Sequence, residues 1–183
     1  MPRLAPLDLA NLTPEQKEVA DAIMAGPRGG LRGPFEAWLR SPVLADRAQK
    51  LGEFCRFHTS LPKHLAEFAI ILTGKHWKAQ FEFYAHARLA VEAGLPHETV
   101  EAVRTGATPA FRDGAERAVY AFVTEYFATN RVSDGTYQAA LATLGGERGV
   151  VDLIGIVGYY GLVSMTLNVF DVGLPEGEPL PLA

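Results

Sequence analysis

The sequence is nearly free of cysteine, since Cys55 is the only one among 183 residues. A single cysteine cannot form an intramolecular disulfide, so a disulfide framework is excluded. The simplest role for Cys55 is that of a small, buried, apolar residue. The first twelve residues lack a long apolar run, so no secretory signal is expected and the cytoplasm is the expected location.

An excess of positive charge is also missing. The chain has 17 Lys and Arg against 21 Asp and Glu, a formal charge of −4, so neither nucleic acid nor an anionic membrane is an expected partner. Residues 150–170 are almost continuously apolar and long enough to cross a bilayer. They include Asp152 and Asn168 and have no basic cluster at either end, which favours a buried core or subunit-interface helix over a membrane span.

Several chemical motifs are absent. The five histidines form no His-x-x-x-His pair for a helical zinc site, and neither a G-x-S-x-G elbow nor a P-loop is present. Gly155, Gly158 and Gly161 recur inside an apolar segment, where they favour close contact between helices rather than phosphate binding. The sequence therefore predicts neither a metal nor an organic cofactor.

The patterns that are present predict an all-α fold of about eight helices, because no segment alternates with a period of two. Thr13 and Gln16 form a capping box that opens a helix ending near residue 25. Gly145 and Gly146 separate the last helix, over 147–170, from the preceding one.

Three segments are expected along the chain. Residues 1–33 form an N-terminal extension with one helix and a Gly-rich loop, 34–172 form the helical domain, and 173–183 form a Pro-rich tail. Within the domain, a helical hairpin over 62–95 is expected to carry the site. Its second helix is predicted to begin at residue 75 and to end near 93.

Glu82 and His86 are four residues apart, so they share one face of this second helix. A carboxylate beside an imidazole favours the protonated ring, which makes His86 a candidate proton donor near neutral pH. Large apolar neighbours favour burial of the pair, whereas a solvated helix face is the simpler alternative. Glu67, on the preceding helix, joins the pair if the two helices pack antiparallel, and is otherwise an exposed carboxylate.

The order of these elements resembles the carboxymuconolactone decarboxylase and alkylhydroperoxidase D superfamily, over roughly residues 34–172. The residues that carry the resemblance are Leu65-Ala66-Glu67, Trp77, Glu82, His86, Ala93-Gly94-Leu95, Glu116-Arg117-Ala118-Val119-Tyr120 and Asn168-Val169-Phe170. The resemblance implies a homo-oligomer, often a trimer or hexamer, that acts on a small molecule.

The resemblance also separates two kinds of chemistry. Peroxidase members place two cysteines seven and four positions before the histidine, where this chain has Ala79 and Glu82. Decarboxylase members instead have Glu-x-x-x-His, which matches Glu82 and His86. The resemblance therefore implies a cofactor-independent lyase in aromatic catabolism. In that reaction His86 would donate a proton, Glu82 would orient the His86 ring and favour its charged form, and Glu67 would position water or substrate.

Two other functions stay open. One is an alkylhydroperoxidase-type peroxide reductase, which would require Cys55 to reach the site. The other is a non-catalytic oligomer that binds small ligands, in which Glu82 and His86 are exposed or locked in structural hydrogen bonds with no adjacent cavity. No dedicated anion-binding residue stands out, and Arg88, Arg104 and Lys78 are candidates only by their proximity in sequence.

Overall fold

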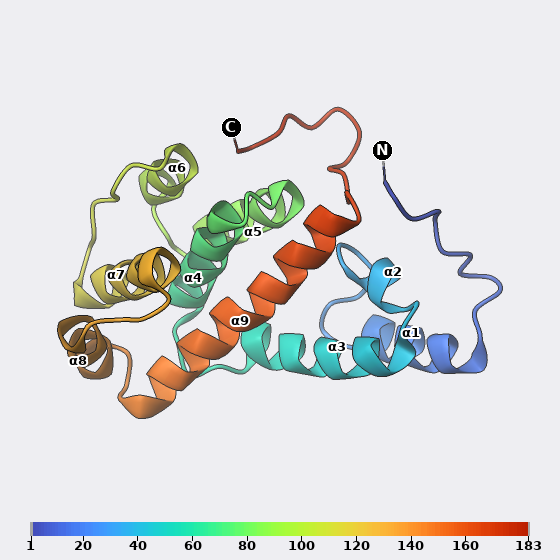
Figure 1. Cartoon of the computed structure of the whole chain (residues 1–183), viewed down its shortest axis with the longest axis horizontal. Coiled ribbons are helices and arrows are strands. Elements are labelled where there is room, and N and C mark those ends of the chain that lie inside the picture. Colours follow the sequence, from blue (N-terminus) through green and yellow to red (C-terminus); the bar gives the residue numbers. More distant parts are fainter. Residues whose placement is uncertain (1, 183) are drawn as a thin grey trace.

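The computed structural model describes residues 2–182, and these contain nine helices and no strand (Figure 1). The predicted all-α class is confirmed, with one helix more than the expected eight. The helices are α1 Pro14–Ala25, α2 Phe35–Trp38, α3 Pro42–Phe57, α4 Lys63–His76, α5 Gln80–Glu92, α6 His97–Thr105, α7 Gly114–Thr129, α8 Asp134–Thr143 and α9 Glu147–Val169.

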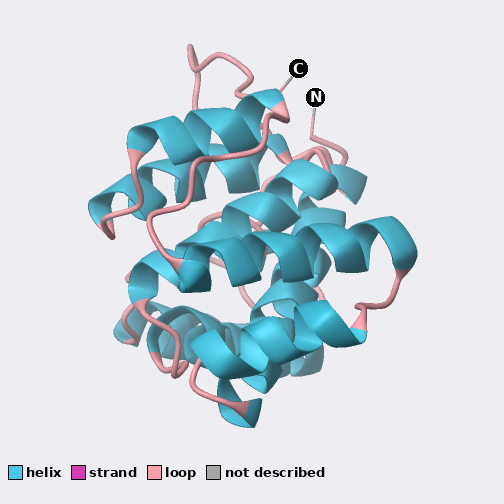
Figure 2. Ribbon diagram, turned by 90° about the vertical axis from the view of Figure 1, so that its left-hand side faces the viewer, coloured by secondary structure: helices cyan, strands magenta, loops and turns pink. Residues whose placement is uncertain are grey.

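Helix α4 is the centre of the molecule. It packs against α5, α7 and α9, and every residue from Leu65 to Gly74 is buried. In Figure 1, α9 runs diagonally past α4, while α1 and α2 lie to the right beside α3, and Figure 2 shows these helices from the side. A helix that is buried on all sides must be apolar on all sides, so a charged residue within it requires a partner. Glu67 is that residue.

The predicted start of the first helix after Thr13 and the predicted start of the last helix at residue 147 are both confirmed. The Thr13 side chain accepts a hydrogen bond from the Gln16 backbone, and the Gln16 side chain accepts one from the Thr13 backbone. Gly145 and Gly146 both have positive φ angles, 84° and 78°, which only glycine adopts at little cost. These two residues turn the chain from α8 into α9.

The predicted start of the second hairpin helix is wrong. Lys75 and His76 complete α4, and the chain leaves the helix until α5 begins at Gln80. Lys78 takes a left-handed conformation with φ 51°, and the Ala79 N–H donates to the carbonyl of Gly74. No glycine or proline marks this turn, which is why helical periodicity did not reveal it.

Gly74 allows α5 to begin close to α4. A Cβ atom at this position would lie 3.4 Å from the backbone nitrogen of Phe83 and 3.7 Å from the Cβ of Glu82. The absence of a side chain at Gly74 therefore lets the first turn of α5, which carries Glu82, pack directly on α4.

Helix α9 satisfies the length and composition criteria for a membrane span, and 67% of its most apolar window is buried within the protein. Burial of this extent is typical of a core helix. After α9 the tail returns over α5 (Figure 1), where the Gln80 side chain donates to the Leu182 carbonyl and accepts from the Leu182 N–H. At the other end of the chain, α1 packs on α3.

We predict that Gly149→Ala destabilises the protein by about 1–3 kcal/mol, because overpacking forces the backbone to move. A Cβ at Gly149 would lie 1.7 Å from the carbonyl oxygen of Leu144. Gly135→Ala is the control, since its Cβ meets no atom within 4 Å. Urea denaturation should show loss of stability for the first variant and none for the second. Equal stabilities would contradict this packing of α9 on the turn before it.

Candidate active site

His86 lies between two glutamates in the interior of the protein. Its Nδ1 is 2.7 Å from Oε2 of Glu67 on α4, and its Nε2 is 3.0 Å from Oε1 of Glu82, one turn earlier on α5. The exposed fractions are 6% for His86, 3% for Glu82 and 2% for Glu67. The structure thus brings together the three residues singled out in the sequence, and the pair does not lie on a solvated face.

The two glutamates determine the charge of the ring. Burial alone lowers the pKa of His86, because it disfavours the charged form. The negative charges of Glu82 and Glu67, together with the hydrogen bond to Glu67, outweigh burial and raise the pKa to about 9. His86 is therefore an imidazolium at neutral pH, with an N–H directed to each side.

The two glutamates are placed differently. Glu82 and His86 line a cavity of about 70 Å³, whereas Glu67 lies behind the ring and does not reach it. Although Glu82 Oε1 is within ion-pair distance of Nε2, it is not well aligned for a hydrogen bond, and this buried atom has no hydrogen-bond partner. Glu67 holds the ring from behind, and Glu82 retains acceptor capacity beside the cavity.

Two tyrosines of α9 form another wall of the cavity. The Tyr160 ring meets the His86 ring edge-on, with centroids 5.0 Å apart. Burial raises the pKa of Tyr160 well above its usual value, and the nearby Glu82 and Glu67 raise it further. The buried Tyr160 hydroxyl is therefore protonated, and it has no hydrogen-bond partner in the protein. Tyr159 lines the same cavity.

The cations of this cavity are Arg28 and Arg32, from the loop between α1 and α2. The three cations proposed from sequence proximity do not line it: Arg88 pairs with Glu92, and Arg104 pairs with Glu101. Two arginines among the glycines of residues 26–33 were the available sequence signal. This signal does not point to the site, because the loop lies far from His86 along the chain.

Cys55 is fully buried on α3 and does not line this cavity. Burial and the nearby Asp152 charge together raise the pKa of its thiol to about 11, although Arg28 opposes both. The thiolate, which is the nucleophilic form, is therefore scarce at neutral pH. Among residues 2–182, no group of three or more His, Cys, Asp or Glu side chains is arranged to hold a metal ion.

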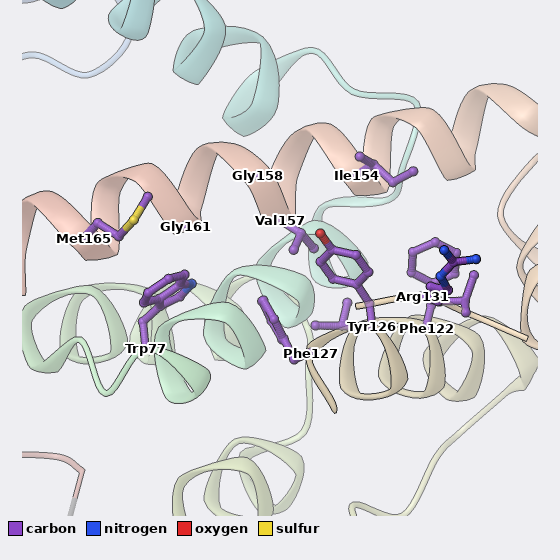
Figure 3. Close-up of a pocket in the computed structure, with 12 residues that line it drawn as sticks. Trp77, Phe122, Tyr126, Phe127, Arg131, Ile154, Val157, Gly158, Gly161 and Met165 are labelled. Carbon is purple, nitrogen blue, oxygen red and sulfur yellow. The ribbon is translucent and has the colours of Figure 1, made fainter. Parts of the chain in front are cut away.

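A larger cavity lies elsewhere. It measures about 420 Å³ and lies between α9 and α7, with Trp77 near one end (Figure 3). Phe127 and Met165 contribute to its mainly apolar lining, and none of the three candidate site residues does. Size alone would favour this cavity, but it lacks the convergent ionisable groups that proton transfer requires.

Comparison with known proteins identifies the fold of this chain. No protein-family model and no curated protein matches the chain. An uncharacterised peroxidase-related protein from Silicibacter sp. TM1040 superposes with a TM-score of 0.75 at 11% identity, over 93% of this chain and 90% of that chain. The apo debrominase Bmp8 superposes with a TM-score of 0.73 at 16% identity, over 96% and 92%.

A Bmp8 variant with a cysteine replaced by alanine, in complex with 2,3,4-tribromopyrrole, gives the same TM-score of 0.73 at 16% identity, over 96% of this chain and 91% of that one. This chain has the alkylhydroperoxidase D-like fold. At sequence identities this low the superpositions establish the shared architecture alone, and the chemistry of this protein depends on its own residues.

The raised pKa of His86 predicts a pH-dependent stability. A histidine has a pKa near 6.5 when unfolded, so its contribution is complete below about pH 6.5 and disappears as the pH rises through about 9. The free energy of unfolding should fall by roughly 3 kcal/mol across this window, since each pKa unit corresponds to about 1.4 kcal/mol.

Glu67→Gln should make this fall smaller and shift it to lower pH, because one of the two charges that raise the pKa is removed. Glu92→Gln is the matched control, since Glu92 is exposed on the same helix as His86 and should leave the profile unchanged. Urea denaturation at a series of pH values measures the stability profiles of the wild type and of these two variants. A flat wild-type profile would show that His86 is not charged in the folded protein.

Proposed function

We propose that this protein is a cofactor-independent lyase of the carboxymuconolactone decarboxylase type, acting on a small carboxylated or lactone substrate. One observation carries the proposal: His86 is buried between Glu67 and Glu82 and faces a cavity together with Glu82. Its raised pKa makes the ring a proton donor at neutral pH. A positioned donor of this kind is what a carbanion or enolate needs after CO₂ has left.

The proposed reaction needs only protein side chains and water. The bond between the carboxylate carbon and its neighbour breaks, CO₂ leaves, and the electron pair remains on the neighbouring carbon as a carbanion or enolate. That carbon then takes the proton of His86 Nε2. Water returns a proton to the imidazole, so the net reaction consumes one proton and releases one CO₂.

Glu67 and Glu82 have separate roles in this proposal. Glu67 accepts the Nδ1 hydrogen bond at 2.7 Å, which fixes the ring and leaves Nε2 directed toward Glu82 and the cavity. Glu82 stabilises the imidazolium and relays the proton from water to Nε2. Glu67 lies behind the ring, so a positioning role replaces the substrate contact expected from the resemblance.

A thiol-dependent peroxide reductase is the less favoured alternative. Cys55 is enclosed, its pKa is raised, and the sequence has no second cysteine to resolve a sulfenic acid. Peroxide reduction abolished by Cys55→Ser would support this alternative. A non-catalytic ligand-binding role assumed no cavity beside Glu82 and His86, and such a cavity is present.

We predict that His86→Asn slows CO₂ release from carboxymuconolactone by about 100-fold or more, the usual contribution of a positioned acid. Glu82→Gln should have a similar effect. The matched control is His58→Asn, because His58 is an exposed histidine outside the cavity, and Cys55→Ser should also retain the wild-type rate. Full activity of the His86→Asn variant would contradict the proposal.

The expected trimer or hexamer remains a prediction. Helix α9 exposes a row of apolar side chains that the monomer does not cover: Val151, Ile154, Met165 and Val169. Apolar surface of this kind often marks an interface between subunits. Sedimentation velocity should show an oligomer that Ile154→Glu weakens, whereas Arg88→Glu, on an exposed part of α5, should not. A stable wild-type monomer would contradict this expectation.

A further inference from the structure

Arg28 is an unusual cation, because part of its charged group is enclosed without a partner. Its Nε and Nη2 are shielded from solvent, and neither has a hydrogen-bond partner in the protein. Other buried charges are paired: Glu116 accepts from Arg112, and Asp152 accepts from Ser60. An unpaired buried charge is costly, so a protein that retains one commonly uses it for a ligand.

Neighbouring residues make room for this guanidinium. It lies over the Phe35 ring, with Cζ 5.2 Å from the centroid. Gly52 faces it from α3, where a Cβ atom would come within 2.5 Å of Nη2 and 2.1 Å of the Tyr159 hydroxyl oxygen. The absence of a side chain at position 52 therefore allows Arg28 and Tyr159 to share this space beside the cavity.

The unpaired atoms also have a particular geometry. Nε–H and one N–H of Nη2 point in the same direction along one edge of the guanidinium. This edge matches the two oxygens of a carboxylate, which accept both hydrogen bonds side by side. A lone hydroxyl or a neutral carbonyl would satisfy only one of the two donors.

We infer that Arg28 binds a carboxylate group of the substrate, and that the ligand is a small organic carboxylate seated between Arg28 and the His86–Glu82 pair. This inference rests on the proposed function, because it specifies which substrate that site accepts. Arg28, Glu82 and His86 all line the same cavity, so a small anion in it contacts the cation and the proton donor together.

The size of the cavity limits this ligand. About 70 Å³ holds a carboxylate and a few further atoms, given that one water occupies about 30 Å³ in the liquid. A longer ligand requires movement of the loop that carries Arg28. The glycines of this loop include Gly29 and Gly33, whose φ angles of 65° and 70° are adopted at little cost only by glycine.

The carboxylate on Arg28 is the one that the substrate retains. Pairing the departing carboxylate with a cation would stabilise the ground state and slow the loss of CO₂. A substrate that is decarboxylated here therefore carries a second anionic group. This requirement distinguishes a dicarboxylate from a simple lactone carboxylate.

The test is titration of the full-length protein with acetate and malonate, followed by nitrogen-15 NMR of the arginine Nε–H groups. We expect both anions to shift the Arg28 signal, whereas acetamide, which has the same shape as acetate but no charge, should not. Arg28→Met should weaken binding by about tenfold or more, the usual effect of losing a charge-assisted pair. Arg28→Lys should lose much of this affinity, because an ammonium lacks the paired donors.

Matched variants separate this inference from the proposed reaction. Arg88→Met removes one positive charge outside the cavity and should leave anion binding unchanged. His86→Asn should lose CO₂ release, whereas the acetate binding that it keeps should still be removed by Arg28→Met. Absence of CO₂ release by the wild type, with Arg28-dependent acetate binding intact, would overturn the proposed reaction and not the anion site.

Thermal unfolding distinguishes a ligand-binding Arg28 from a merely structural one. Removal of a structural arginine would lower the melting temperature. Arg28→Met should leave the melting temperature unchanged or raise it, since it removes two enclosed donors that have no hydrogen-bond partner. Acetate should raise the melting temperature of the wild type and not of Arg28→Met. Equal acetate affinity of the two proteins, or the absence of acetate and malonate binding to the wild type, would overturn the inference.

Discussion

The hydrogen bond between Glu67 and His86 is the interaction on which the rest of the structure depends. It joins the central helix α4 to α5 at a place where neither side chain is solvated. A carboxylate inside a helix buried on all sides is tolerated only with a partner, and a buried imidazole is charged only beside a carboxylate. Helix packing and the chemical character of the site therefore have a common cause.

The neighbouring structure makes this interaction effective. The turn at 77–79 and the bare backbone of Gly74 bring the first turn of α5 against α4, so Glu82 approaches the ring from the second side. Tyr160 closes the space beside the ring with a protonated hydroxyl. Of the three candidate site residues, His86 and Glu82 therefore face the cavity, while Glu67 supports the His86 ring from behind.

The sequence predicted the parts of this arrangement that depend on local spacing. A spacing of four positions places Glu82 and His86 on one helix face, and capping residues and paired glycines located helix ends. The left-handed turn at Lys78 could not be predicted, because no glycine or proline marks it. The position of Arg28 also escaped prediction, since only tertiary packing brings its loop beside Glu82.

Shared architecture with a peroxidase-related protein and a debrominase leaves the chemistry open, and the residues decide it. A thiol centre needs an accessible low-pKa sulfur, whereas this chain has one enclosed cysteine of raised pKa. The larger apolar cavity beside α9 has no ionisable pair, so volume and chemistry occur in different parts of the molecule. Proton transfer at His86 is the activity that we propose for the small cavity.

The charge state of His86 is the central claim, and nitrogen-15 NMR of labelled histidine measures it directly. At neutral pH both ring nitrogens of His86 should carry a proton, and the titration midpoint should lie near pH 9. A ring with one bare nitrogen at neutral pH, or a midpoint at or below the ordinary value of about 6.5, would contradict the claim that a buried imidazolium is the acid of this site.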